Sequence, residues 1–280
     1  MSSRITTAFT RARAAGRAAF VPFLCGGDPN RETSLKACET VLAAGADLLE
    51  IGVPFSDPLA DGPTNQRAAQ RALDAGMTPS GVLDIVQQLR AGGHEAPVVL
   101  YLYYNLIYAR GEKAFVAEAA AAGVDALLVL DLPPEESASL RELCAEAGLG
   151  LVFIVAPTTP RERLPIIAGA ATSFLYYVSR TGVTGATDTI AEDLRERIAP
   201  IREATDLPIV VGFGVSKREH VEQVAAAADG VVVGSALVSL FEVHQDDPEA
   251  ALAELRAKVL ELIGGLARPT GGTEGSVTRG

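Results

Sequence analysis

The sequence has no tryptophan, and aromatic residues make up only 5% of its 280 residues. Proteins that bind single-stranded nucleic acid stack the bases on aromatic side chains, so this shortage disfavours such a surface. Positive charge is scarce as well, because 24 lysines and arginines against 35 aspartates and glutamates leave a net charge of −11. A face that binds nucleic acid or an anionic membrane would need a basic patch. We therefore expect neither nucleic acid nor a membrane among the partners.

Long hydrophobic runs and paired cysteines are also missing. No stretch approaches the ~18 uninterrupted apolar residues of a membrane-spanning helix, and no signal-peptide run follows the first arginines. The three cysteines are odd in number, far apart and in no metal-binding spacing: Cys25, Cys38 and Cys144. They are predicted to be buried apolar residues in a reducing compartment, so a cytoplasmic location is expected.

The usual residues of metal and nucleophile chemistry are equally sparse. The three histidines have no second ligand at metal spacing, so we expect them at the surface and expect no metal site. No serine or cysteine has the context of an activated nucleophile. No lysine ends a predicted strand, which disfavours a Schiff-base mechanism. Carboxyl groups are left as the candidates for catalysis.

Apolar residues are abundant, at 48% with a mean hydropathy of +0.23, which is enough for a large core. They form eight apolar runs, each followed by a helical pattern. The runs cover residues 19–24, 47–53, 98–103, 126–130, 151–155, 173–178, 208–211 and 230–233. Repeated strand–helix units need parallel crossovers, and a count of eight favours a closed barrel over an open sheet. We predict an α/β fold, a single-domain (β/α)8 TIM barrel over residues 1–266.

The helical patterns end at glycines in several places, as helices commonly do. They cover residues 31–44, 66–75, 79–90, 112–122, 135–147, 161–167, 190–204 and 217–227. An extra helix is predicted before the first strand, within residues 3–16. A short extra helix ending at Glu242 is predicted before the closing helix over 248–262. Residues 267–280, rich in glycine, threonine and serine, are predicted to be a disordered tail.

One stretch, residues 48–63, combines a buried strand with a loop that carries two acids. Its first six residues are apolar on both faces except for Glu50, the pattern of a parallel strand covered on both sides. A buried carboxylate needs a partner or a raised pKa, so Glu50 is either part of a structural ion pair or a catalytic group. Asp57 and Asp61 follow on a loop shaped by prolines and glycines. A strand acid followed by a loop acid suits proton transfer in a cleft.

Two glycine clusters follow the last two predicted strands. Gly212 and Gly214 end the seventh strand, and Gly234 with Ser235 ends the eighth and opens a helix. Glycines let the backbone approach an anion, and a helix amino terminus favours negative charge. We interpret the pair as a phosphate cradle, with tight turns as the alternative. A third cluster, residues 179–187, is either a lid over the substrate or an ordinary flexible loop.

These motifs, taken in order, resemble those of the tryptophan synthase alpha chain family over about residues 18–242. The matching segments are 20–23 (FVPF), 27–29 (G-D-P), 50–63 (EIGVPFSDPLADGP), 179–185 (SRTGVTG), 212–214 (GFG) and 234–235 (GS). The resemblance implies a lyase that splits indole-3-glycerol phosphate into indole and glyceraldehyde 3-phosphate, without metal or cofactor in this chain. It also implies roles for three residues. Glu50 would move protons at indole C3 and at the glycerol hydroxyl, Asp61 would accept the indole N–H, and Tyr176 would line the site near Glu50.

The same resemblance implies residues that bind the substrate and the partner. The apolar indole pocket would be walled by Phe23, Tyr103, Leu128 and Phe213. The phosphate would be held by Gly185, Phe213, Gly214, Gly234 and Ser235, and Thr184 would close against Asp61. The implied partner is the pyridoxal-phosphate beta chain, in an α2β2 assembly. Its docking surface would include Asp57, Pro58, Asn105 and Pro133.

Two positions depart from the family pattern. Asn65 stands where an aliphatic residue is usual, and Cys25-Gly26 replaces the usual threonine and its neighbour. Neither change removes a catalytic group, but Asn65 bears on loop packing, partner coupling and substrate preference. Three other functions remain open for comparison: a stand-alone lyase that releases free indole, a weakly catalytic regulatory subunit, and another phosphate-binding barrel such as a sugar-phosphate isomerase.

Overall fold

Eight parallel strands form a closed barrel in which each strand pairs with its neighbours in sequence and β1 pairs with β8. The structure is a computed structural model that describes residues 3–178, 187–212 and 214–267, except for the side chains of 187–191. The strands are β1 (Ala19–Cys25), β2 (Leu49–Gly52), β3 (Val98–Leu102), β4 (Ala126–Val129), β5 (Gly150–Val155), β6 (Leu175–Val178), β7 (Ile209–Gly212) and β8 (Gly230–Val233). This confirms the predicted (β/α)8 TIM barrel.

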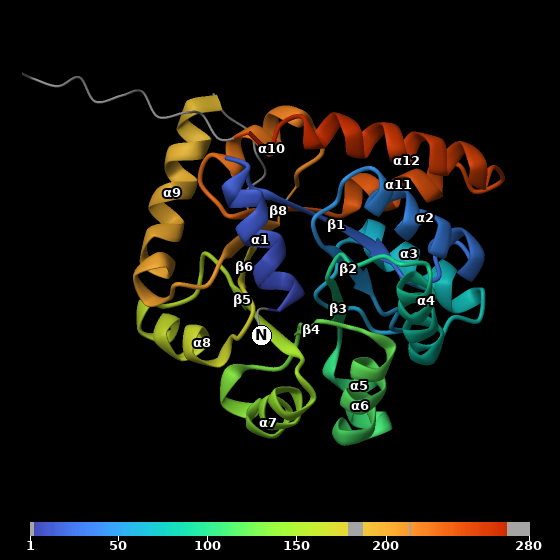
Figure 1. Cartoon of the computed structure of the whole chain (residues 1–280), viewed down its shortest axis with the longest axis horizontal. Coiled ribbons are helices and arrows are strands. Elements are labelled where there is room, and N and C mark those ends of the chain that lie inside the picture. The colour runs from blue at the N-terminus through green and yellow to red at the C-terminus, as the bar shows by residue number, and fades with distance from the viewer. Residues whose placement is uncertain (1–2, 179–186, 213, 268–280) are drawn as a thin grey trace, which may run out of the picture.

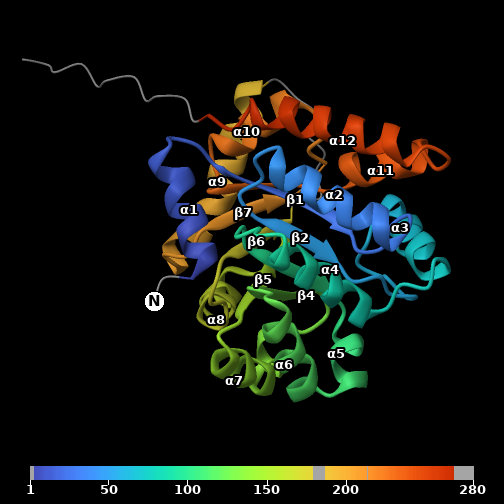
Figure 2. The ribbon, with the colours of Figure 1, turned by 45° about the vertical axis from the view of Figure 1, so that its right-hand side comes forward.

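Helices surround the ring of strands, as Figures 1 and 2 show. They are α1 (Arg4–Ala14), α2 (Arg31–Ala43), α3 (Pro63–Asp74), α4 (Pro79–Ala91), α5 (Tyr104–Arg110), α6 (Glu112–Ala122), α7 (Ala138–Ala147), α8 (Leu164–Ala170), α9 (Thr187–Ala204), α10 (Arg218–Ala225), α11 (Ser235–Val243) and α12 (Pro248–Ile263). The extra amino-terminal helix and the short helix before the closing one, α1 and α11, are both present as predicted.

Several element boundaries differ from the predictions. Helix α3 begins at Pro63 rather than at residue 66, because proline fits the first helical position, where its missing N–H is not needed. Helix α5 was not predicted at all. The helices predicted from residues 135 and 161 each begin with a 3₁₀ turn, at Pro134–Glu136 and Arg161–Arg163. Of the predicted tail, only Ala267 is described, and it forms a β-bridge with Arg17.

Helix α1 covers the end of the barrel at which the strands begin (Figure 1). Its apolar face is buried, and its Phe9 ring lies 5.7 Å from that of Phe174, just before β6. Four positions later, one turn further along α1, Arg13 pairs with Asp229, which precedes β8. The opposite end, where the strands finish, therefore remains available for a site.

The covered end is held by a repeated hydrogen-bonding arrangement between neighbouring strands. Asp47, before β2, accepts from the N–H of Phe20 in β1 at 2.9 Å. In the same way Asp125, before β4, accepts from the first residue of β3 at 2.8 Å, and Asp229 accepts from the first residue of β7 at 3.0 Å. Between β5 and β6 the acceptor is the hydroxyl of Thr172. Each of the three acids also pairs with an arginine: Arg17, Arg90 and Arg202, respectively.

The core fills the barrel and the space between the strands and the helices. All three cysteines are buried and free, as predicted. Within the described ranges, no helix has the length and apolar character needed to cross a membrane.

The Asp47 arrangement gives a prediction about stability. Asp47→Ala would leave the buried Phe20 N–H without its acceptor and Arg17 without its ion-pair partner, so the free energy of unfolding should fall by about 3 kcal/mol. Denaturant unfolding measures this. The matched control is Glu222→Ala, which breaks an exposed pair with Arg218 and should cost about 0.5 kcal/mol or less. Equal losses in the two variants would contradict this account.

Candidate active site

Glu50 lies in the middle of β2 and is buried, with 1% of its surface exposed. Its neighbours across the sheet are Phe23 on β1 and Val99 on β3. Among the described residues it forms no ion pair, and its Oε2 atom has no hydrogen-bond partner, so the structural ion pair considered from the sequence is not found. Burial, with the nearby charge of Asp61 as a second cause, raises the pKa of Glu50 to about 8. The carboxyl group therefore carries a proton near neutral pH.

Asp61 lies on the loop between β2 and α3 and is held by two tyrosines of β3 and its following turn. The Tyr101 hydroxyl donates to Oδ1 at 2.9 Å and the Tyr103 hydroxyl donates to Oδ2 at 2.7 Å. Burial raises the pKa of Asp61, and the hydrogen bonds from Tyr103, Tyr101 and Asn65 oppose this shift by favouring the charged form. Asp61 is half-buried whereas Glu50 is buried, in agreement with the predicted pairing of a strand acid and a more exposed loop acid.

The loop that carries Asp61 is fixed at both sides of the acid. The Ala60 N–H donates to the Tyr103 hydroxyl at 2.9 Å, so this hydroxyl links the loop backbone to the carboxylate. From the first turn of α3, the Gln66 side chain donates to the Asp61 carbonyl oxygen at 2.9 Å. The acid therefore has a defined position although it does not belong to a helix or strand.

Glu50 and Asp61 both line a cavity of about 630 Å³ at the ends of the strands. Its wall combines apolar residues with a glycine-rich end. The apolar and aromatic lining residues include Phe23, Tyr101, Leu130, Ile154, Tyr176 and Val232. The glycine-rich end is formed by Gly212, Gly214, Gly234 and Ser235. This combination fits an apolar ligand group that carries an anion at one end.

The glycine-rich end has features that suit an anion. Ser235 is the first residue of α11, a nine-residue helix, so the positive end of the helix dipole points toward this part of the cavity. Gly214 has a φ of +53°, a left-handed conformation that disfavours a side chain. The cavity wall here consists of backbone rather than bulky side chains.

Most of the predicted substrate-binding residues that the structure describes lie at this cavity. Phe23 lines it together with Gly214, Gly234 and Ser235, and Tyr103 lines a small adjoining cavity together with Asp61. Tyr176, predicted near Glu50, lines the same cavity as Glu50. Leu128 is different, because it is fully buried and does not line either cavity. Leu130, two residues further along and hence on the same side of the chain, lines the cavity instead. Three predicted residues lie outside the described part of the chain: Thr184, Gly185 and Phe213. Residues 179–186, most of the segment considered as a lid, lie outside it as well.

Sequence reasoning missed Tyr101, Leu130 and Ile154 as lining residues. No sequence signal identified Tyr101, because the register that pairs Glu50 with Val99, two residues before Tyr101, is known only from the structure. Side chains two apart on a strand point to the same face, so Tyr101 had to share the interior of the barrel with Glu50. Asn65, noted from the sequence as a departure, also lines the cavity, and its buried Oδ1 atom has no partner among the described residues.

The four predicted partner-surface residues follow β2, β3 and β4: Asp57, Pro58 and Pro133 lie on loops, and Asn105 lies in the first turn of α5. Asp57, Asn105 and Pro133 are exposed, and Pro58 is half-buried. On the same loop as Asp57, Leu59 is 93% exposed, which is unusual for a leucine. These residues are therefore accessible to a second chain.

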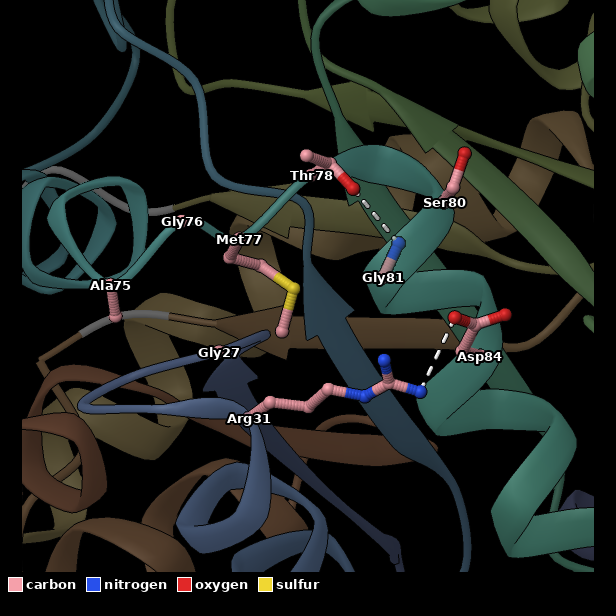
Figure 3. Close-up of a pocket in the computed structure, with 9 residues that line it drawn as sticks. All are labelled: Gly27, Arg31, Ala75, Gly76, Met77, Thr78, Ser80, Gly81 and Asp84. Atoms are coloured by element: carbon pink, nitrogen blue, oxygen red, sulfur yellow. Dashed lines mark hydrogen bonds and ion pairs between the residues drawn. The ribbon is translucent and has the colours of Figure 1, made fainter.

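A second, smaller cavity of about 230 Å³ lies outside the barrel, between the start of α2 and the start of α4. Figure 3 shows two contacts in it: Arg31 pairs with Asp84 at 3.2 Å, and the Thr78 hydroxyl accepts from the Gly81 N–H. It contains neither Glu50 nor Asp61. Among the described residues, no cluster of three or more histidine, cysteine, aspartate or glutamate side chains could hold a metal ion. The candidate catalytic groups thus gather in the larger cavity.

Comparison with known proteins gives one consistent result. A family model described as tryptophan synthase alpha chain matches residues 9–265. The tryptophan synthase alpha chain of Opitutus terrae is 56% identical over 266 residues, covering 95% of this chain and all of that protein. The alpha chain of a Geobacter species is 47% identical over 263 residues, covering 94% of each.

Solved structures agree with these relatives. The tryptophan synthase subunit alpha of Legionella pneumophila superposes with a TM-score of 0.87 at 33% identity, covering 95% of this chain and 98% of that one. A chain of Mycobacterium tuberculosis tryptophan synthase superposes with a TM-score of 0.86 at 35% identity, covering 96% of this chain and all of that one.

The contacts of Tyr103 give a prediction about the acid-bearing loop. Tyr103→Phe would remove the acceptor of the Ala60 N–H and one donor to Asp61, so hydrogen exchange of the loop amides around Ala60 should become about fivefold faster. Mass-spectrometric or NMR exchange measures this. The control is Tyr104→Phe, whose hydroxyl donates instead to Glu112 at 2.9 Å. If exchange at this loop is the same in both variants, the hydroxyl does not hold the loop.

Proposed function

Because the chain belongs to the tryptophan synthase alpha chain family, we propose that Glu50 and Asp61 are the two acids of its reaction. The reaction is the alpha reaction of tryptophan synthase (EC 4.2.1.20), a step of tryptophan biosynthesis. It is a retro-aldol cleavage of indole-3-glycerol phosphate to indole and glyceraldehyde 3-phosphate. The observation that supports the proposed roles is the buried, unpaired carboxyl group of Glu50 in the same cavity as Asp61.

In the proposed mechanism the protonated Glu50 gives its proton to C3 of the indole ring. This makes the ring cationic, and the negative charge of Asp61, which accepts the ring N–H, stabilises that cation. The bond between C3 and the glycerol side chain then breaks, and its electrons neutralise the ring. The hydroxyl on the departing carbon loses its proton to the Glu50 carboxylate and becomes the aldehyde. Glu50 ends the cycle protonated, as it began.

The environment of each acid suits its proposed role. Burial keeps Glu50 protonated near neutral pH, so it can act first as an acid and then as a base. Hydrogen bonds from the tyrosines favour the ionised form of Asp61, which is the form that stabilises a cation. Tyr176, which is buried in the wall of the same cavity, is proposed to position the substrate beside Glu50.

The rest of the cavity is assigned by the chemistry of the substrate. We propose that the phosphate binds at the end formed by Gly214, Gly234 and Ser235, where the α11 amino terminus favours an anion. The indole ring would then lie among the apolar residues, with Phe23, Leu130 and Ile154 as its walls. No step of this mechanism requires a cofactor bound by this chain.

We also propose that the chain acts with a tryptophan synthase beta chain, which holds the pyridoxal phosphate and receives the indole, in an α2β2 assembly. The proposed docking surface comprises the exposed Asp57, Asn105 and Pro133 together with Pro58, on the segments that follow β2, β3 and β4. The highly exposed Leu59 adds apolar area to this surface. A cytoplasmic location is proposed on the basis of the three free cysteines.

The test of the proposed roles is indole release from indole-3-glycerol phosphate by the purified full-length chain. Glu50→Gln and Asp61→Asn should each lower kcat by at least about 100-fold, because each removes a charge or proton that the reaction needs and keeps the size of the side chain. Thermal unfolding serves as the control for folding. A folded Glu50→Gln variant with near-normal turnover would contradict the assignment.

The same assay with added beta chain tests the partner. Activation by the beta chain should saturate, and Asn105→Ala should raise the beta-chain concentration needed for half-maximal activation without changing the rate of the chain alone. Ile166→Ser, which changes an exposed residue on α8, is the matched control. Fast turnover that the beta chain does not alter would favour a stand-alone lyase. Activation of the beta chain without any indole release would favour a regulatory subunit.

A further inference from the structure

In the mechanism described so far, Tyr101 serves only as one of the donors that favour the ionised form of Asp61. It is the fourth residue of β3 and pairs across the sheet with Gly52 at the end of β2. Its hydroxyl donates to Asp61 Oδ1 at 2.9 Å, from inside the cavity that also contains Glu50. The hydrogen bond joins a barrel strand directly to the acid on the loop.

The two tyrosines that hold Asp61 are anchored differently. The Tyr103 hydroxyl also accepts the Ala60 N–H, so it is tied to the same loop as the acid. The Tyr101 ring instead packs edge-on against Phe23 of β1, with ring centroids 5.0 Å apart. Phe23 in turn pairs with Glu50 in the sheet. Tyr101 is thus the tyrosine that connects Asp61 to the part of the barrel that holds Glu50.

One hydrogen bond at each oxygen fixes the plane of a carboxylate, whereas a single bond leaves it free to rotate about its Cβ–Cγ bond. Of the two tyrosines, Tyr103 bonds only to Oδ2 and Tyr101 bonds to Oδ1, so Tyr101 is the one that orients Oδ1, in addition to the hydrogen bond that Asn65 makes to this side chain. A carboxylate oxygen can accept more than one hydrogen bond, so a ligand N–H can bind without displacing the tyrosine. Bonds to a charged acceptor are also about twice as strong as neutral ones, which makes this restraint effective.

We propose that Tyr101 is a positioning residue that fixes the carboxylate plane of Asp61 relative to Glu50. This inference rests on the proposed function of the two acids. Without the Tyr101 hydroxyl, Asp61 would be present and charged but poorly oriented toward the N–H of the ring. Misorientation of this kind affects the transition state more than the binding of the substrate.

The test is Tyr101→Phe, which keeps the ring on Phe23 and removes only the hydroxyl. Indole release by the full-length chain should show kcat reduced by roughly tenfold, the effect of losing one hydrogen bond to a charged group, with KM changed by less than about threefold. The acid limb of the pH profile of kcat/KM should also move to higher pH. The sign follows because ionised Asp61 is the active form, and removal of a donor raises its pKa.

The control is Tyr104→Phe, which also breaks a 2.9 Å bond from a tyrosine to a carboxylate but lies between α5 and α6, outside the cavity. Its kcat and pH profile should match those of the unmodified chain. If Tyr101→Phe fails to fold, Tyr101→Leu lacks the hydroxyl as well and carries the same prediction. A folded variant with unchanged kcat and an unchanged acid limb would overturn the proposal.

A double-mutant cycle separates positioning from packing. In an Asp61→Asn background, Tyr101→Phe should lower kcat by much less than tenfold, because the carboxylate through which the tyrosine acts is gone. An equal fold-loss in both backgrounds would show that Tyr101 acts by packing alone. Absence of indole release by the unmodified chain would instead count against the proposed function, so the two failures can be told apart.

Discussion

The burial of the Glu50 carboxyl group is the constraint on which the site depends. A carboxylate inside a barrel would ordinarily be paired, but Glu50 has one oxygen without a partner in the described structure, and the nearby group is another acid. Burial and the charge of Asp61 both disfavour ionisation, so the proton stays on Glu50. The donors around Asp61 act in the opposite sense and favour its charge. Burial raises the pKa of both acids, but only Asp61 has hydrogen-bond donors that oppose the shift, so the two chemically similar groups differ in their tendency to hold a proton.

Such an arrangement costs stability, because burying an acid without a partner is unfavourable. Three acids that stabilise the barrel lie at its other end, where α1 covers the strand starts. There, Asp47, Asp125 and Asp229 each bridge two neighbouring strands and pair with an arginine. These acids are ion-paired, whereas Glu50 and Asp61 at the open end form no ion pair among the described residues.

Much of the barrel could be predicted from the sequence, because a strand buried on both faces and a helix of period 3.6 leave distinct apolar patterns. Glu50 was evident for the same reason, as the one charge in such a strand. Helix α5 was missed because it has only seven residues and its first turn has no side-chain cap. Leu128 was wrongly predicted to line the cavity because the alternation of side chains along a strand tells which face a residue occupies, but not how far along the barrel it lies. Tyr101 resembled a core aromatic, since its role depends on a loop acid that is distant in sequence.

The most direct test of this account is the titration of Glu50 itself. The infrared band of a protonated carboxyl group, taken as the difference between the unmodified chain and Glu50→Gln, can be followed from about pH 5 to about pH 10. The account predicts that the band disappears with a midpoint at about 8, and that Asp61→Asn lowers this midpoint. A midpoint near the ordinary value of 4.5 would contradict it, because Glu50 would then be ionised at neutral pH and could not be the proton donor.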